Sequence, residues 1–316
     1  MKKMVVIYNE NDWDKKIPFE SNPTRESFED WHERGLENGI EMYRANIDWY
    51  DKKNCVFKKS WAYRDKKWLK IKTPVRADLI FDKLAGKYDY ALFDLKMSIC
   101  KDIKIFNHPL FRTMLDNKLS QYLFLSDFMP KSFLATNKKE LVSTLGKIST
   151  TKVVVKPLYG SGGVGIIIEE KKKIKPAKIE FPVLVQEFIK SEKGIPGFSK
   201  KEEVSDLRLI FINHKLIYAL SRIARKGSLF TNFHQGAVAV LVLESEIPSS
   251  VKKLAQKIID KLSIYPEANY SLDFIFTNSG KPLLVEMNTT PGFDLLNIVG
   301  TEEIKEKHFQ NFIRVI

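Results

Sequence analysis

The first hundred residues mix short apolar runs with polar segments. Met4–Tyr8 is a short apolar run and predicts a strand, while Thr24–Tyr43 predicts a helix because Thr24 can cap a loose apolar stripe. The stripe consists of Phe28, Trp31, Leu36 and Ile40. The remaining predicted elements are a hairpin around Cys55–Ile71 and strands at Asp78–Phe81 and Tyr90–Leu95. Together they indicate an α/β lobe over residues 1–106.

Helices are predicted more clearly after Asn107-His108-Pro109, which is a turn signal. One helix is expected from about Phe111 to Ser126, because Leu115, Leu119, Tyr122 and Leu123 have helical spacing. A second helix is expected after Asn137, a suitable N-cap. A third begins at Ser249 and places its apolar residues on one face.

Strands fill most of the rest of the chain. Two are predicted around a glycine loop at 152–168, and the last two are joined by Asn278-Ser279-Gly280, a hairpin turn. The stretch Ser191–Val204 is rich in glycine, proline and charge and is interpreted as an inserted loop. The other predicted strands are Val183–Phe188, 207–212, 215–220, 237–243, Tyr270–Thr277 and Lys281–Met287.

Composition narrows the class of protein. The 316 residues carry a net charge of +13, with lysines spread along the chain, which suits either a solvated basic surface or a cleft for phosphates and an acidic substrate. Basic motifs interleaved with aromatic residues are lacking, which argues against RNA binding. No apolar run approaches the roughly 18 residues that span a bilayer, and the first apolar stretch is too short for a signal peptide. Two cysteines outside any CxxC pair argue against a zinc site and favour a cytoplasmic location.

The glycine loop is the first candidate for chemistry. Gly160, Gly162 and Gly165 spell GxGxxG, but Ile166-Ile167-Ile168 follows, and that is strand rather than helix sequence. A dinucleotide-binding Rossmann loop needs a helix there, and GK[ST] is absent, so a Walker P-loop is excluded as well. A strand–loop–strand hairpin can close over phosphates with its backbone N–H groups, and Lys156 at its start can reach a phosphate oxygen. Taken alone, a mobile hairpin tip explains the loop equally well.

The closing hairpin is the candidate metal site. Glu286 and Asn288 are two apart on one strand and share a face, and Asp273 lies on the adjoining strand. Three oxygen donors among apolar neighbours suit a hard cation such as Mg²⁺, with Mn²⁺ as an alternative. Acids on a solvated face are the weaker explanation, because unpaired acids on an apolar hairpin are costly to bury.

Further polar residues lie between these two segments. Arg208 and Arg222 suit grips on phosphate or carboxylate, and Asn232 can add an oxygen ligand or orient a phosphate. The strand ending in Gln186-Glu187-Phe188-Ile189 suits an adenine pocket, although an ordinary strand leaving the core is the favoured interpretation when it is considered alone.

Taken in order, these segments resemble the ATP-grasp superfamily, in the branch of the ribosomal-protein-S6 glutamate ligase and glutathione synthetase. The resemblance covers about residues 105–295, and the order and spacing of its blocks make it specific. The matching stretches are Val153–Ile168, Val185–Ile189, Asp206–Arg208, Arg222–Ala237, Ser271–Phe274 and Leu284–Phe293. Ile105–Lys118 is similar to the entry of the family's central domain.

The resemblance implies an α/β fold in which two subdomains, 107–189 and 190–316, clasp ATP after an N-terminal lobe, 1–106. It implies that Lys118, Lys156 and the loop residues Gly160, Ser161, Gly162 and Gly163 touch the phosphates, and that Gln186, Glu187, Phe188 and Ile189 frame the adenine. Asp273, Glu286 and Asn288 would hold Mg²⁺. The expected catalytic residues are Arg208, Arg222 and Asn232, of which Arg222 and Asn232 would face the γ-phosphate and the acyl phosphate.

The predicted function is an ATP-dependent carboxylate–amine ligase acting through an acyl phosphate. Its expected substrates are a small carboxylate and an amine, with a peptide or protein tail as an option, and a homo-oligomer is left open. The alternatives are an ATP-grasp kinase that phosphorylates a hydroxyl and a nucleotide-binding module without turnover. One departure bears on the acceptor: relatives often have His-Arg-Gly-Gly where this chain has His234-Gln235-Gly236-Ala237, which lacks that cation.

Overall fold

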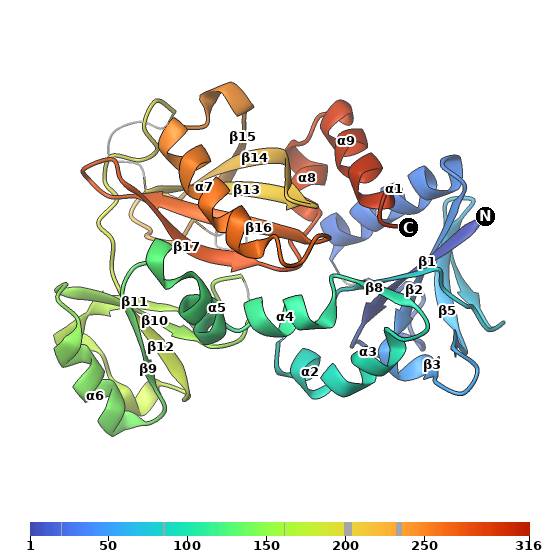
Figure 1. Ribbon diagram of the computed structural model, residues 1–316, viewed down its shortest axis with the longest axis horizontal. Helices are drawn as coiled ribbons and strands as arrows, with labels where there is room; N and C mark the ends of the chain where they lie inside the picture. The colour runs from blue at the N-terminus through green and yellow to red at the C-terminus, as the bar shows by residue number, and fades with distance from the viewer. Residues whose placement is uncertain (20, 85, 161, 199–203, 232–235) are drawn as a thin grey trace.

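The computed structural model describes the chain except residues 20, 85, 161, 199–203 and 232–235. The structure has three larger sheets, one at one end of the long axis of the molecule and two, one above the other, towards the opposite end (Figure 1). The N-terminal sheet lies at one end, and the sheet that carries the glycine loop lies at the other end. The third sheet, which contains the C-terminal hairpin, lies above the glycine-loop sheet in this view.

The N-terminal sheet has six strands in the order β6-β5-β2-β1-β7-β8. The strands β2, β1, β7 and β8 are parallel, and β5 and β6 form an antiparallel hairpin at one edge. Met4 and Val6 face a core with α1, whereas Val5 and Ile7 face a second core with α3, as the alternation of a strand buried on both sides requires. The bounds are β1 Lys2–Tyr8, α1 Asn22–Glu37, β2 Ile40–Asn46, β5 Ser60–Arg64, β6 Lys67–Ile71, β7 Leu79–Asp82, α2 Gly86–Ala91, α3 Phe93–Ile99 and β8 Lys104–Phe106; the two-stranded β3 Tyr50–Asp51 and β4 Val56–Phe57 stand apart.

Two predictions in this lobe are wrong. The helix expected over Thr24–Tyr43 ends at Glu37, because Gly39 turns the chain with a φ of 74° and β2 begins at Ile40. The strand expected at Tyr90–Leu95 is replaced by α2 and α3. Its apolar residues also have helical spacing, since Tyr88, Leu92, Leu95 and Ile99 all pack against the same core.

The link to the next sheet is two helices rather than the single helix expected over Phe111–Ser126. The helix α4, Pro109–Leu115, ends just before Asp116, and α5, Lys118–Leu125, begins directly after Asn117. The Asn117 side chain accepts hydrogen bonds from the backbone N–H groups of Leu119 and Ser120, which caps the second helix. The break places Lys118 at the start of a helix.

The glycine-loop sheet has four antiparallel strands in the order β11-β10-β12-β9, with α6 packed on one face. The predicted strands of this part are confirmed, and Asn137 caps α6 by accepting from the N–H of Glu140. The bounds are β9 Ser132–Ala135, α6 Lys138–Lys147, β10 Lys152–Pro157, β11 Ile167–Glu170 and β12 Val183–Glu187.

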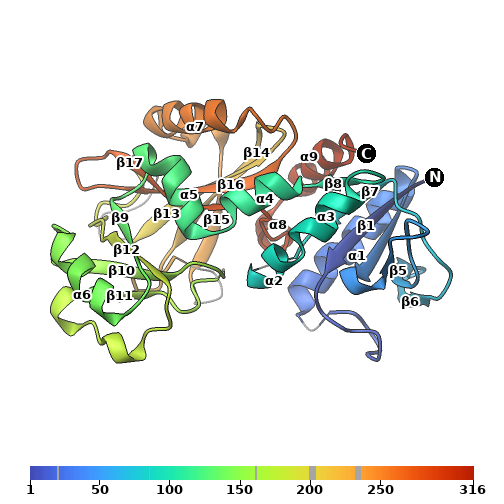
Figure 2. The same cartoon turned by 60° about the horizontal axis from the view of Figure 1, so that its bottom comes forward.

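The third sheet has the order β15-β14-β13-β16-β17. The amphipathic helix α7 covers one face, and the C-terminal helices α8 and α9 lie between the other face and α1 of the N-terminal lobe (Figures 1 and 2). The sequence prediction ended with the hairpin and missed α8 and α9. The bounds are β13 Ser205–Ile212, β14 Lys215–Ile223, β15 Val238–Val242, α7 Ser249–Leu262, β16 Asn269–Phe276, β17 Pro282–Asn288, α8 Asp294–Val299 and α9 Glu302–Ile313. In the described part of the chain, no helix is both long and apolar enough to cross a membrane.

Candidate nucleotide and metal site

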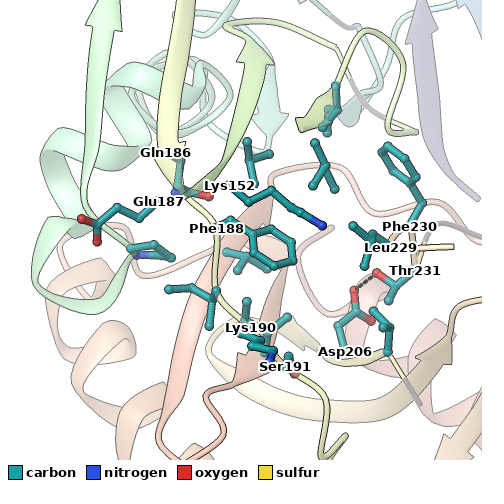
Figure 3. Close-up of a pocket in the computed structure, with 18 of the residues that line it drawn as sticks. Lys152, Gln186, Glu187, Phe188, Lys190, Ser191, Asp206, Leu229, Phe230 and Thr231 are labelled. Atoms are coloured by element: carbon teal, nitrogen blue, oxygen red, sulfur yellow. Dashed lines mark hydrogen bonds between the residues drawn. The ribbon is translucent and has the colours of Figure 1, made fainter. Parts of the chain in front are cut away.

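A cavity of about 550 Å³ lies between the glycine-loop sheet and the third sheet. Its walls come from β10, β11 and β12 on one side and from β13, β14, β16 and β17 on the other. Figure 3 shows side chains from both sides pointing into this space. Nine of the described candidate residues line it directly, namely Lys156, Gly163, Gln186, Glu187, Phe188, Ile189, Arg222, Asp273 and Glu286.

The glycine loop connects β10 to β11 and forms one rim of this region. Gly160, Gly162, Gly163 and Gly165 all have positive φ, a conformation that other residues adopt only with strain. A Cβ on Gly165 would lie 2.8 Å from Cγ of Pro157, so that position also needs glycine for space. Ser161 lies outside the described residues. The strand after the loop is present, as the isoleucine run predicted.

Two lysines from different elements meet at the strand β17. Lys156 is buried at the end of β10 and donates to the carbonyl oxygen of Val285 at 3.1 Å. Lys118 donates to the carbonyl oxygen of Gly160 at 2.6 Å, and its Nζ lies 3.4 Å from the carboxylate of Glu286. Burial lowers the pKa of Lys156 to about 8. The two predicted phosphate lysines are therefore close to the same acid.

The end of β12 forms the apolar side of the cavity. The Gln186 side chain is buried and donates to Ser132 at 3.0 Å, while Glu187 accepts from Ser149 at 2.8 Å. Phe188 and Ile189 follow them along the wall. Figure 3 shows Lys152 extending beside the Phe188 ring, and its Nζ lies 5.4 Å from the ring centre. The strand β12 therefore ends at an apolar wall of the cavity, formed by Phe188 and Ile189.

The three predicted metal ligands lie on neighbouring strands. Asp273 and Glu286 are directly opposite each other across β16 and β17, and Asn288 lies opposite Ser271. Asp273 lines the large cavity, Glu286 lines both this cavity and a smaller one of about 90 Å³, and Asn288 lines only the smaller one. Among the described residues, no group of three His, Cys, Asp or Glu side chains is placed to hold a metal. A site here would therefore consist of two carboxylates and one amide.

Arginines bind the buried end of this hairpin. Arg208 holds Asp273 with two hydrogen bonds, of 2.8 and 2.7 Å. Arg222 donates to Asp206 at 2.9 and 2.6 Å and to Asp273 at 2.7 Å. Both arginines were predicted, and the structure brings them to the same carboxylate. Asn232, the third predicted catalytic residue, lies outside the described residues.

The charges of this arginine cluster shift the pKa values of its acids in opposite directions. Burial alone would raise the pKa of Asp273, but its two arginines outweigh burial and lower it. Asp206 has only one arginine, and burial raises its pKa. Burial likewise acts to lower the pKa of Arg222, but Asp206 and Asp273 outweigh it, so this pKa is raised. Asp273 is thus kept ionised, the state that a cation requires.

The sequence analysis gave no site role to Asp206, Lys152 or Thr231, three polar residues that line the large cavity. Asp206 accepts from Thr231 at 2.5 Å, the bond drawn in Figure 3, and Lys152 extends from β10. Alternation along a strand was the available signal. Asp206 is two positions from the predicted Arg208, and Lys152 is four positions from the predicted Lys156. Each pair therefore lies on one face of its strand. Thr231 had no such signal.

The comparisons with known proteins agree on one family. The profile of the RimK-like ATP-grasp domain matches residues 119–308. A "Probable alpha-L-glutamate ligase" of Nitrosococcus oceani is 28% identical over 186 residues, which cover 57% of this chain and 56% of that protein. The chain thus spans about half the length of the curated relatives that it matches.

Two solved structures resemble nearly the whole chain. The VanG D-Ala:D-Ser ligase from Enterococcus faecalis has a TM-score of 0.67 and 15% identity, with 99% of this chain and 98% of that chain covered. The Chryseobacterium gregarium RiPP-associated ATP-grasp ligase, solved with ADP and a leader and core peptide, has a TM-score of 0.60 and 17% identity, with 99% and 96% covered. These matches confirm the predicted ATP-grasp fold. ATP-grasp ligases as a group bind ATP and Mg²⁺.

Proposed function

This chain belongs to the RimK-like ATP-grasp family, and from that premise we propose that it is an ATP-dependent ligase that joins a carboxylate to an amine. The reaction would pass through an acyl phosphate, which the amine attacks with release of phosphate. The convergence of Lys156, Arg222 and Glu286 on one cavity is the observation that supports the proposal most strongly. The amino-acid substrate is proposed to be acidic, as the glutamate ligase named above suggests, and the acceptor to be a peptide or protein tail.

The nucleotide is assigned to the large cavity. Its base would lie against Phe188 and Ile189, with the backbone at the end of β12 pairing with the base edge. Its phosphates would lie under the glycine loop near Lys118 and Lys156. Two cations close to Glu286 can stabilise the charge that develops on the transferred phosphoryl group.

The donor set at the hairpin fits Mg²⁺. Oδ1 of Asp273 accepts a single recorded hydrogen bond, from Arg208, so it keeps capacity for a cation. The one ion pair of the Glu286 carboxylate among the described residues is with Lys118, at 3.4 Å. Asn288 donates its amide NH₂ to Ser271 at 3.4 Å, which leaves its oxygen as a ligand. These three residues would hold Mg²⁺, which when bound would neutralise part of the charge of the phosphates.

The arginines are proposed to contact the γ-phosphoryl group and the acyl phosphate. Arg222 uses Nε and Nη2 for its two aspartates, and Arg208 uses Nε and Nη2 for Asp273. Each guanidinium keeps Nη1 for an anionic oxygen. Held in this way by carboxylates, the two groups need little reorganisation when charge moves onto the phosphoryl group. Asn232 is retained in the proposal as an orienting residue.

Two further expectations are carried forward as parts of the proposal. The working units are residues 1–106, 107–189 and 190–316, of which the last two enclose the nucleotide. A cytoplasmic location is proposed because both cysteines, Cys55 and Cys100, are free thiols.

The test is nucleotide turnover with glutamate and a short peptide acceptor, followed by mass spectrometry of the acceptor. A ligase releases ADP and phosphate only when both substrates are present, and the acceptor gains one amino-acid residue. Hydroxylamine in place of the amine should trap the activated acid as a hydroxamate. Phosphate left on the acceptor would replace the proposal with a kinase, and stabilisation by MgATP without turnover across a panel of amino acids would replace it with a binding module.

A further inference from the structure

The net charge of the chain is concentrated in one short segment that the nucleotide site does not use. Residues 52–76 contain ten lysines and arginines and one acid, Asp65, so they carry a formal charge of +9 out of the +13 of all 316 residues. The segment folds into β4, β5, β6 and their connections. Figures 1 and 2 place this part of the N-terminal lobe at the opposite end of the molecule from the glycine-loop sheet.

Most of these cations have no acidic partner. Within the described residues, ion pairs within 4 Å are recorded only for Arg64 with Glu41 and for Lys66 with Glu33. Lys59 and Lys70 instead lie over tryptophan rings, with Nζ of Lys59 4.7 Å from the centre of Trp13. Lys67 and Lys72, at the two ends of β6, are exposed. Unneutralised cations gathered on one edge favour an anionic partner.

The backbone of β6 has hydrogen-bonding groups along its outer edge that pair with no other strand of the described chain. It is the terminal strand of its sheet, and a two-residue turn at Asp65-Lys66 connects it to β5. Arg64 and Lys67 close that turn and form a hydrogen-bonded pair. By the antiparallel alternation, the backbones of Lys67, Leu69 and Ile71 hydrogen-bond to β5. The N–H and C=O groups of Trp68 and Lys70 point away from β5. No recorded backbone hydrogen bond of the described chain occupies that side. Such an edge can pair with another strand.

We propose that the edge of β6 binds an acidic, extended peptide segment of a partner by strand addition. Strand addition would satisfy the free backbone groups of Trp68 and Lys70. Acidic side chains on one face of the added strand would lie near Lys67, and those on the other face near Lys70 and Lys72. A nucleic acid fits less well, since it has no backbone pattern complementary to the strand edge. Of the tryptophans in this region, Trp61 and Trp49 are buried and Trp13 and Trp68 are half-buried, so none is fully exposed for base stacking. The surface lies apart from the nucleotide cavity, so it would hold a partner while another segment of that partner reacts.

The experiment is fluorescence anisotropy on the full chain with a labelled twelve-residue Glu-Glu-Thr-Thr repeat (the Glu-Thr peptide) and a matched Gln-Gln-Thr-Thr repeat. This order places glutamates on both faces of an extended strand. We expect binding of the Glu-Thr peptide only, weakened about tenfold by the double substitution Lys67→Glu/Lys72→Glu. The control Lys252→Glu/Lys253→Glu changes the charge equally on exposed residues of α7 and should alter Kd by less than twofold. Circular dichroism melts of each variant show that the fold is kept, and Lys67→Gln/Lys72→Gln should give an intermediate Kd.

A third peptide separates strand addition from general charge attraction. Methylation of alternate backbone nitrogens of the Glu-Thr peptide keeps its charge but blocks pairing with β6, and it should abolish the binding. Equal binding of the methylated peptide would overturn the proposal, as would an equal effect of the α7 control. Tighter binding of a twelve-residue oligo(dT), or of vesicles containing phosphatidylserine, that is lost in the same β6 variant would also overturn it, in favour of nucleic acid or membrane. Because no turnover is measured, failure here leaves the ligase proposal intact.

Discussion

Two clusters of buried charge, each with two acids and two bases, differ in what surrounds them. In the N-terminal lobe, Lys96 contacts both Asp82 and Asp89, and Arg112 lies 3.5 Å from Asp89. All four side chains are enclosed, with exposed fractions of 1% or less. The second cluster consists of Asp206, Asp273, Arg208 and Arg222, and three of its members, all but Arg208, line the large cavity.

The difference shows which cluster can act on a ligand. The enclosed cluster lines neither of the two cavities described above. It ties α3 and α4 to the end of β7, and Arg112 also donates to the carbonyl of Leu84. It can stabilise the lobe, but its buried side chains cannot contact a substrate. The cavity cluster leaves guanidinium nitrogens free and keeps Asp273 ionised, so it can exchange partners when a charged ligand enters. Buried ion pairs of similar composition thus serve structure in one place and chemistry in the other.

The largest expected effect comes from removing a cavity carboxylate. Glu286→Gln should lower kcat by about 10²–10³-fold, because it removes a charge that Mg²⁺ and Lys118 share, while the melting temperature changes little. Steady-state ADP release and a thermal melt measure the two quantities. Glu303→Gln, an exposed position on α9, is the matched control. Full activity in Glu286→Gln would remove the metal site from the proposal.

A substitution in the enclosed cluster should lower stability and leave kcat nearly unchanged. Lys96→Met leaves Asp82 and Asp89 buried without their cation and should reduce the free energy of unfolding by about 3–5 kcal/mol. Urea denaturation measures the loss, and kcat per folded molecule should stay near that of the wild type. The exposed pair Lys66–Glu33 is the control, since Lys66→Met should cost less than about 1 kcal/mol. A fall in kcat without a loss of stability would contradict the distinction between the two clusters.

The pH dependence of ATP affinity tests whether Lys156 contacts the phosphates. Burial lowers its pKa to about 8, and bound phosphate would raise that pKa again. ATP affinity should therefore fall above pH 8, by up to about tenfold per pH unit. The effect on folding in the absence of ATP has the opposite sign. Between about pH 8 and the ordinary lysine pKa of 10.5, the unfolded chain binds more protons at this residue, so the protein gains stability as pH rises.

Calorimetry of ATP binding at several pH values tests this prediction, and Lys156→Met should flatten the curve. Burial also lowers the pKa of Lys83 to about 8, but Lys83 is present in both proteins and its contribution cancels in the comparison. An unchanged slope in the variant would mean that Lys156 does not contact the phosphates.

The smallest expected effect lies in the glycine loop. Gly165→Ala forces a Cβ onto a residue with a φ of 73° and within 2.8 Å of Pro157, so the loop must shift, and KM for ATP should rise a few-fold. Gly39→Ala is the control, because its φ of 74° carries a similar strain of about 1 kcal/mol in a turn of the N-terminal lobe that lines neither described cavity. An equal rise of KM in both variants would show a general loss of stability and no specific effect of the loop.

Part of the fold could be predicted because local sequence specifies it. The continuous apolar runs Val153–Val155 and Val183–Val185, and the helical spacing from Ser249, predicted the strands and the helix that the structure contains. Tyr90–Leu95 failed for the opposite reason, since its apolar residues fit both periods. Packing against the N-terminal core decided in favour of helices there.

Part of the candidate site could likewise be predicted from the sequence, and part depends on the tertiary structure. The sequence by itself determined the chemical types and their order: two lysines, a glycine loop, and oxygen donors on one hairpin, because spacing along a strand fixes which side chains share a face. Only the tertiary structure decided which groups meet. Lys118 reaches Glu286 across 168 positions, and Arg222 reaches Asp273 across 51, by folding that no local pattern encodes. The charges of one cluster are exposed to a ligand and those of the other are sealed because long-range packing, rather than residue type, sets what lies beside them.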